Sequence, residues 1–190
     1  MCKYYISSDL PCARVMALNL CIAMNISTPK PQPHLRYGFQ NRLFAICDQL
    51  AIDLNCYIVI MDNFRGETKD DHPDIWAWTS RHPYEANKGC DAKDVHPVKN
   101  DIQATIQHLN ETYSIQQSDM SAIGFCWGVW EMTKASTEFP FKCAVGFHPS
   151  LRFEELFGGD IMEMMKMAVK VPHLYCVAGN DPDYIKKVEM

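Results

Sequence analysis

The pentapeptide GFCWG at 124–128 has the residue types and the spacing to carry a nucleophile. A glycine two positions before a reactive side chain and another two positions after it are typical of a nucleophile elbow, where a strand turns sharply into a helix. Side chains in place of Gly124 and Gly128 would collide with neighbouring backbone in such a turn, so the spacing has a steric cause. We therefore predict that the thiol of Cys126 lies at the apex of this turn and is the catalytic nucleophile.

A thiol at this position has a physical reason to be reactive. At the N-terminus of a helix, the free N–H groups and the helix dipole stabilise a thiolate and lower the pKa of the cysteine. The alternative interpretation of Cys126 is a small buried core residue, which is a common role for a free thiol. The glycines on both sides favour the nucleophile.

The composition argues against several other kinds of protein. The 190 residues fit one domain, and the net charge of −5 comes without a block of Lys or Arg, so we expect no nucleic-acid partner. No apolar run approaches the roughly 20 residues that cross a bilayer, so we expect no membrane partner. The nine cysteines contain no Cys-x-x-Cys pair and no zinc-binding spacing. We therefore expect reduced thiols, a cytoplasmic location, no metal and no cofactor.

Strands and helices alternate along the chain around the pentapeptide. This order is typical of a parallel α/β sheet with helices on both faces, in which functional residues gather at the carboxyl ends of the strands. Cys126, His148 and Asp181 each follow a predicted strand, so we expect them on one rim. The predicted helices cover Phe39–Asn55, Val95–Tyr113 and Val129–Thr137, with a mixed segment at Phe153–Val169, and the predicted strands cover Cys56–Met61, Asp119–Phe125, Lys142–Phe147 and His173–Ala178.

The first 37 residues differ in character from the rest. They hold four of the eleven prolines, and TPKPQPH at 28–34 predicts an extended linker. The apolar run Val15–Met24 is a weak match to a signal-peptide core, because Asp9 precedes it and a good cleavage site does not follow it. We predict an atypical segment over residues 1–37, poorly ordered or loosely attached, and a domain over residues 38–190.

This domain resembles the dienelactone hydrolase family, a branch of the α/β-hydrolases that uses a cysteine nucleophile. The resemblance covers roughly residues 38–185 and implies an α/β-hydrolase-like parallel sheet. It is carried by YGFQN at 37–41, YIVIMDNFRGE at 57–67, IGFCWG at 123–128, GFHPS at 146–150 and AGNDPD at 178–183.

The resemblance also implies roles for single residues. Family members hydrolyse small esters or lactones through an acyl-enzyme on sulfur, which implies Cys126 as the nucleophile and Asp181 as the acid that orients a histidine. The backbone N–H of Trp127 matches an oxyanion donor. The chain departs from the family twice: no histidine follows Asp181, and the residues at 33–36 (PHLR) form no strand and contain no carboxylate. We therefore expect a domain that is incomplete at both ends.

Several residues keep two interpretations. Asp181 is either the triad acid or a turn residue, because Asn-Asp-Pro is strong turn chemistry. His148 is either a substitute base or, as we expect, a strand-end histidine that is satisfied by hydrogen bonds. Arg65 and Arg81 could contact an anionic substrate, but we expect both to be solvated surface charges.

These observations favour an enzyme, a dienelactone hydrolase-like hydrolase of small carboxylic esters or lactones. One alternative is a catalytically impaired binding or regulatory remnant of the same fold that lacks the triad histidine, and another is a redox-responsive thiol protein. Because deacylation by water needs a base, we expect this chain to be weakly active or to stall as a thioester. The sequence contains no signal of the oligomeric state.

Overall fold

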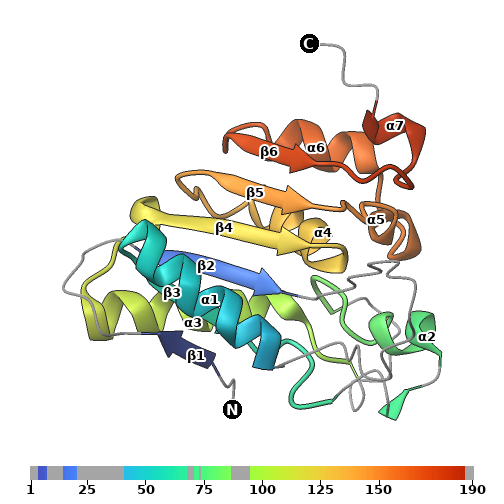
Figure 1. Cartoon of the computed structure of the whole chain (residues 1–190). Helices are drawn as coiled ribbons and strands as arrows, with labels where there is room; N and C mark the ends of the chain where they lie inside the picture. The colour runs from blue at the N-terminus through green and yellow to red at the C-terminus, as the bar shows by residue number, and fades with distance from the viewer. Residues whose placement is uncertain are drawn as a thin grey trace.

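A six-stranded sheet forms the centre of the protein, in the order β1-β3-β2-β4-β5-β6 (Figure 1). The computed structural model describes residues 4–7, 15–20, 41–67, 71–72, 74–86 and 95–186, and at 4–7, 15–20, 41–43 and 75 it describes the backbone alone. Among these described strands, β1 is antiparallel to β3 and the other neighbours pair in parallel. The strands are β1 (Tyr4–Ser7), β2 (Val15–Leu20), β3 (Tyr57–Met61), β4 (Met120–Phe125), β5 (Ala144–Phe147) and β6 (His173–Cys176).

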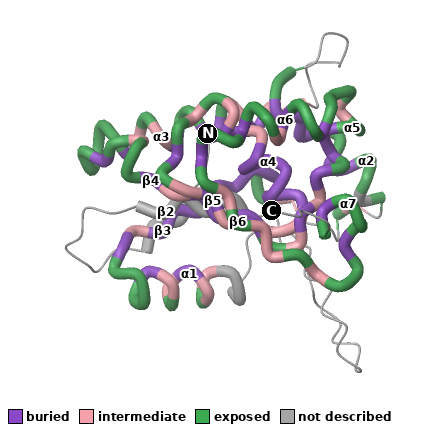
Figure 2. The backbone as a smooth tube through the Cα atoms, turned by 90° about the horizontal axis from the view of Figure 1, so that it is seen from above, coloured by how far each residue is buried: buried purple, intermediate pink, exposed green. Residues whose placement is uncertain are grey.

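Helices cover both faces of the sheet. Figure 2 shows α1 on one face and α3, α4 and α6 on the other, while α2, α5 and α7 lie toward the carboxyl ends of the strands in Figure 1. Within the described parts of the chain, no helix combines the length and the apolar character that a membrane crossing requires. The helices are α1 (Asn41–Leu54), α2 (Ile75–Thr79), α3 (Val98–Tyr113), α4 (Trp127–Ala135), α5 (Phe153–Leu156), α6 (Ile161–Ala168) and α7 (Asp183–Lys186), with a short 3-10 turn η2 (Gln117–Asp119) before β4.

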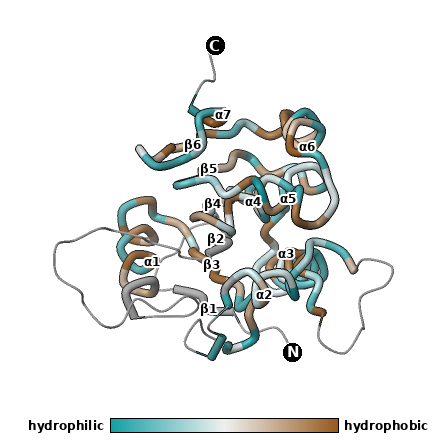
Figure 3. The backbone as a smooth tube through the Cα atoms, turned by 90° about the vertical axis from the view of Figure 1, so that its right-hand side faces the viewer, coloured by the Kyte–Doolittle hydropathy of each residue, from teal (hydrophilic) through white to brown (hydrophobic). Residues whose placement is uncertain are grey.

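Strand β3 shows why the central strands are apolar along their whole length. Successive side chains of a strand point to opposite faces. Ile58 and Ile60 pack with Cys47 of α1 in the smaller core, whereas Val59 and Met61 join the larger core on the opposite face. Helices cover both faces, so both sets are buried, and the tube of β3 has the brown colour of hydrophobic residues in Figure 3.

The predicted strands and helices occur in the predicted order, although β1, β2 and the short helix α2 were not predicted. The boundaries differ for identifiable reasons. Helix α3 begins at Val98, three residues later than predicted, because Pro97 precedes it in an extended conformation. The mixed segment Phe153–Val169 divides into α5 and α6. Gly158 lies between these two helices at a φ of 78°, a left-handed conformation that suits glycine.

Two described parts of the N-terminal region, β1 and β2, belong to the sheet, where no strand was predicted. Strand β2 lies inside the sheet, hydrogen-bonded in parallel to both β3 and β4. Strand β1 forms the edge of the sheet beside β3. An apolar run such as Val15–Leu20 suits a strand with neighbours on both sides, and the sequence alone does not distinguish it from a targeting segment. The predicted linker at 28–34 and residues 33–36 lie outside the described residues.

Candidate active site

Cys126 lies where β4 ends and α4 begins. It is the N-cap residue of α4 and has a φ of 52° and a ψ of −113°, a conformation that L-residues rarely adopt. The sharp turn brings the backbone of α4 close to the strand. A Cβ added at Gly124 would lie 2.5 Å from the carbonyl oxygen of Gly128 and 2.8 Å from the backbone N of Val129. This close approach is the steric reason for glycine at position 124.

The sulfur of Cys126 is partly exposed and has hydrogen-bonding neighbours. Its Sγ lies 3.1 Å from the Oγ of Ser150, and the backbone N–H of Trp127 also hydrogen-bonds to it. Burial raises the pKa of the Cys126 thiol, and these two hydrogen bonds and the positive charge of Arg152 act against that rise. The negative charge of Asp181 adds to it, so the pKa lies above its ordinary value overall, and the lowered pKa expected at a helix N-terminus is not found.

The parallel register places three candidate residues on one rim. The backbone N–H of Cys126 donates to the carbonyl of Phe147 at 2.9 Å, and the N–H of His148 donates to the carbonyl of Cys176 at 2.9 Å. Cys126 and His148 therefore directly follow neighbouring strands, and Asp181 comes from the loop after the next one. We call Cys126, His148, Ser150 and Asp181 the rim.

Asp181 is almost fully buried and faces His148. Its Oδ1 lies 2.5 Å from the Nδ1 of His148, and its Oδ2 accepts a hydrogen bond of 2.6 Å from the backbone N–H of Ala178. The side chain of Asp181 is 1% exposed and that of His148 is 33% exposed. Both interpretations of Asp181 thus describe part of its surroundings, because it closes its own turn and also pairs with an imidazole.

A cavity of about 200 Å³ opens beside this pair. Arg152 supplies a positive charge to its wall, and the guanidinium lies 4.3 Å from the ring centre of Trp76 on α2. This contact connects the cavity to the α2 segment (residues 74–86). The cavity is lined by His148, Pro149, Ser150, Arg152, Asn180, Asp181, Pro182 and Tyr184.

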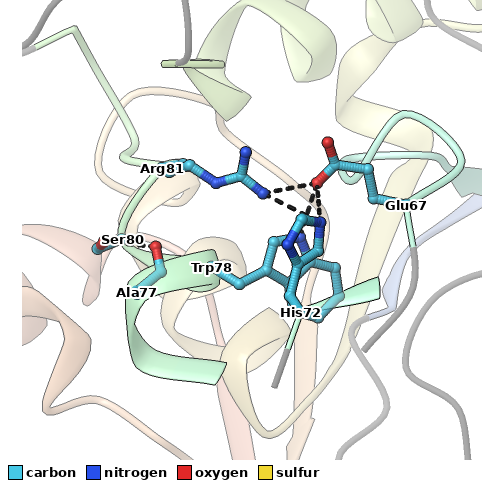
Figure 4. A network of polar contacts seen from close by, with 6 residues as sticks. All are labelled: Glu67, His72, Ala77, Trp78, Ser80 and Arg81. Carbon is cyan, nitrogen blue, oxygen red and sulfur yellow. Dashed lines mark hydrogen bonds and ion pairs between the residues drawn. The ribbon is translucent and has the colours of Figure 1, made fainter. Parts of the chain in front are cut away.

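The α2 segment is attached to the loop after β3 by a polar network around Glu67 (Figure 4). One carboxylate oxygen, Oε2, accepts from the indole N–H of Trp78 at 2.9 Å and lies 2.7 Å from Arg81 and 2.9 Å from His72. Although burial raises the pKa of Glu67, these three neighbours lower it overall. Arg81 is therefore ion-paired, as is Arg65 with Asp101 at 3.0 Å. Arg65 is exposed and Arg81 is partly exposed, so both lie at the surface as expected, each with a carboxylate partner that the sequence did not indicate.

Behind the rim lies a layer of buried groups that we call the support layer, comprising Asn63, Phe64, His82 and Glu131. The ring of Phe64 lies 5.1 Å from that of Trp127 in the elbow and 4.9 Å from that of His82. The amide of Asn63 donates to both carboxyl oxygens of Glu131, at 2.8 and 2.7 Å. Glu131 is fully buried on α4, so this layer fixes the helix that begins at Cys126.

Sequence reasoning missed two parts of this arrangement. The contact between Ser150 and Cys126 crosses from one strand end to the next, and GFHPS at 146–150 gave the only local signal of it. The buried pairing of Glu131 carries no sequence signal, because an acid in a helix ordinarily faces solvent. Within the residues that the structure describes, no group of three or more His, Cys, Asp or Glu side chains is arranged to hold a metal ion.

The parallel sheet, the helices on both faces and the strand-turn-helix at Cys126 define a protein of the α/β-hydrolase class. Residues 37–189 match the sequence profile of the Dienelactone hydrolase family. The chain therefore belongs to the dienelactone hydrolase family, as the sequence resemblance implied.

Comparisons with individual proteins add little to this assignment. A solved structure assigned by name to the dienelactone hydrolases, from Klebsiella pneumoniae subsp. pneumoniae, is 11% identical in sequence, with a TM-score of 0.48. The alignment covers 95% of this chain and 81% of that one. A comparison with curated proteins gave no significant match.

Proposed function

We propose that this chain hydrolyses small carboxylic esters or lactones through an acyl-enzyme on Cys126. In this proposal Asp181 orients an imidazole and the backbone N–H of Trp127 binds the oxyanion. The observation that carries it is the strained backbone of Cys126, at a φ of 52° on the N-terminus of α4. Strain of this kind costs on the order of 1–3 kcal/mol and persists mainly at functional sites, where the surrounding structure enforces it.

The chemistry has two steps. The Cys126 thiolate attacks the carbonyl carbon, and the negative charge that develops on the carbonyl oxygen is stabilised by backbone N–H donors. Collapse of this intermediate expels the alcohol, which takes up a proton, and leaves a thioester. A water molecule that loses its proton to a base then attacks the thioester and releases the acid.

The second step depends on His148. It is the imidazole that faces Asp181 among the described residues, with a buried carboxylate oxygen 2.5 Å from Nδ1, an ion-pair distance without the geometry of a hydrogen bond. The described side chain that is hydrogen-bonded to the sulfur is nevertheless Ser150 and not His148. We therefore propose that acylation is faster than deacylation and that the thioester accumulates.

The surroundings of the site support a small substrate. A cavity of about 200 Å³, lined by Ser150 and not by Cys126 itself, has room for an acyl group of a few carbon atoms next to the residue that contacts the sulfur. None of the described cysteines, which are Cys47, Cys56, Cys126, Cys143 and Cys176, is part of a disulfide. Free thiols in this number support the cytoplasmic location that we propose, because glutathione keeps cytosolic cysteines reduced.

A chromogenic acetate ester tests the proposal. We expect a burst of released alcohol that approaches one equivalent per chain, slow turnover, and a mass increase of one acetyl group on the peptide that contains Cys126. Cys126→Ala should abolish the burst, whereas Cys143→Ala, which removes another partly exposed thiol, should leave it intact. Asp181→Asn should slow the already slow turnover further, because it removes the carboxylate that faces the base, and should leave the burst in place.

A second candidate function is a non-catalytic binding or regulatory remnant. The observation that favours it is the hydrogen bond of the sulfur to a hydroxyl in place of an imidazole. No burst from an ester panel, together with identical behaviour of the wild-type chain and Cys126→Ala, would select this candidate.

A further inference from the structure

Ser150 contacts Cys126 through both its side chain and its backbone. Its Oγ lies 3.1 Å from Sγ, and its backbone N–H donates to the carbonyl of Cys126 at 3.3 Å. Ser150 lies in the loop after β5, whereas Cys126 follows β4, so the contact joins two strand ends that lie side by side in Figure 1.

The loop that carries Ser150 is held in a defined conformation. His148 has a φ of 55°, and its backbone N–H is hydrogen-bonded to Cys176 of β6. Pro149 follows with its ring-fixed backbone angle. Backbone hydrogen bonds to β6 and to Cys126 therefore fix the position of the Ser150 hydroxyl.

The thiol needs donors such as this hydroxyl. Burial disfavours the charged form of Cys126, and Asp181 repels it. Arg152 attracts the thiolate, while the imidazole of His148 faces Asp181 through Nδ1. Tyr184 also lines the cavity beside Asp181. A hydroxyl that donates to a thiolate is a charge-assisted hydrogen bond, about twice as strong as one between neutral groups.

We propose that Ser150 is a positioning residue for the nucleophile: its hydroxyl donates to the sulfur of Cys126, holds Sγ beside the cavity and favours the thiolate. This inference rests on the proposed role of Cys126. Ser150 lines the cavity and Cys126 does not, so Ser150 links the cavity to the sulfur.

The rate of alkylation of Cys126 by iodoacetamide, measured against pH by peptide mass spectrometry, tests the proposal. Ser150→Ala should move the midpoint of the profile upward by about one pH unit and slow alkylation near pH 7.5 by about tenfold, with little change in the high-pH plateau. Alkylation needs no turnover, so this result is independent of whether the chain hydrolyses esters.

Two further variants separate the hydroxyl from the shape of the side chain. Ser150→Thr keeps the hydroxyl and adds a methyl group. Ser150→Val has nearly the same shape as the threonine variant, with a methyl group in place of the hydroxyl. The threonine variant should keep the wild-type midpoint and the valine variant should shift it upward. This pair decides the question even if Ser150→Ala does not fold.

The chain offers a matched control in a second thiol–hydroxyl pair, in which Cys143 Sγ donates to Ser121 Oγ at 3.3 Å. Ser121→Ala should leave the Cys126 profile unchanged, and Cys126→Ala should remove the signal. Superimposable profiles of the wild type, Ser150→Val and Ser150→Thr would overturn the proposal. An equal slowing at every pH, the plateau included, would also overturn it, because that result reports access and not ionisation.

Discussion

The rim and the support layer hold their polar groups in opposite ways. On the rim, groups from different strand ends face one another, as His148 faces Asp181 and Ser150 contacts Cys126. In the support layer, titratable groups are buried without a counter-charge in hydrogen-bonding contact, although the charge of Glu67 acts on His82 against the effect of burial. Glu131 is held by a neutral amide, and neither ring nitrogen of His82 has a hydrogen-bond partner among the described residues.

The rim therefore has charged groups that can take part in a reaction, whereas the support layer holds the structure. Burial raises the pKa of Glu131 well above its ordinary range, against the hydrogen bond from Asn63 and with the help of Asp101. Burial lowers the pKa of His82 to about 4, with His96 and Arg81 acting in the same direction. Both groups are therefore driven toward their neutral forms, and the support layer stays uncharged beneath a rim whose charges can take part in a reaction.

The largest effect should follow Gly124→Ala, which strains the elbow that both regions share. The added Cβ would meet backbone atoms of Gly128 and Val129 that have no side-chain freedom to move away. We expect a loss of more than about 3 kcal/mol in the free energy of unfolding, at or above the upper end of overpacking costs.

Urea unfolding measures this loss, and Gly179→Ala is the matched control because a Cβ there meets no atom within 4 Å. If both variants unfold at the wild-type urea concentration, the close approach at Gly124 does not determine the elbow.

Glu131→Gln should make the protein more stable than the wild type as the pH rises. The pKa of Glu131 is raised in the folded protein. Its contribution to the free energy of unfolding is therefore complete below the unfolded pKa, near 4.3, and is lost as the pH rises toward the folded pKa. Glutamine stays neutral at every pH. Above pH 5 the free energy of unfolding of the variant should therefore rise relative to that of the wild type, by at most about 1.4 kcal/mol per pH unit.

Urea unfolding at several pH values between 5 and 8 gives this slope for both proteins. Glu163→Gln on the exposed face of α6 should show no such gain, because that carboxylate is 65% exposed. Parallel stability curves for wild type and Glu131→Gln would mean that Glu131 carries its charge inside the core.

His82→Phe should give a smaller effect of opposite sign. The folded pKa of His82, about 4, lies below the unfolded value near 6.5. Neutral His82 therefore contributes to the free energy of unfolding at neutral pH, and this contribution is lost as the pH falls. Between pH 8 and pH 5 the wild type should lose about 2 kcal/mol more than the phenylalanine variant. Unfolding midpoints that fall together as the pH is lowered would show that His82 is already protonated or has found a partner.

The sequence predicted the parts of the fold that depend on local pattern. Strands β3, β4, β5 and β6 follow from short apolar runs, and α1 and α3 follow from apolar residues at helical spacing. Strand β2 was missed because its apolar run matches several structures until its neighbours in the sheet are known. The Glu67 network that pairs Arg81 was missed because its members are brought together by the turn of the chain around α2.

The same division applies to the candidate site. The sequence alone indicated the elbow, because a side chain at Gly124 would clash with backbone only four and five residues further along the chain. It also determined that Cys126, His148 and Asp181 follow strands. Only the tertiary structure decided that His148 faces Asp181 and that Ser150 contacts the sulfur. Those contacts depend on which strand ends lie side by side in the sheet, and strand order is set by packing over the whole domain and not by local spacing.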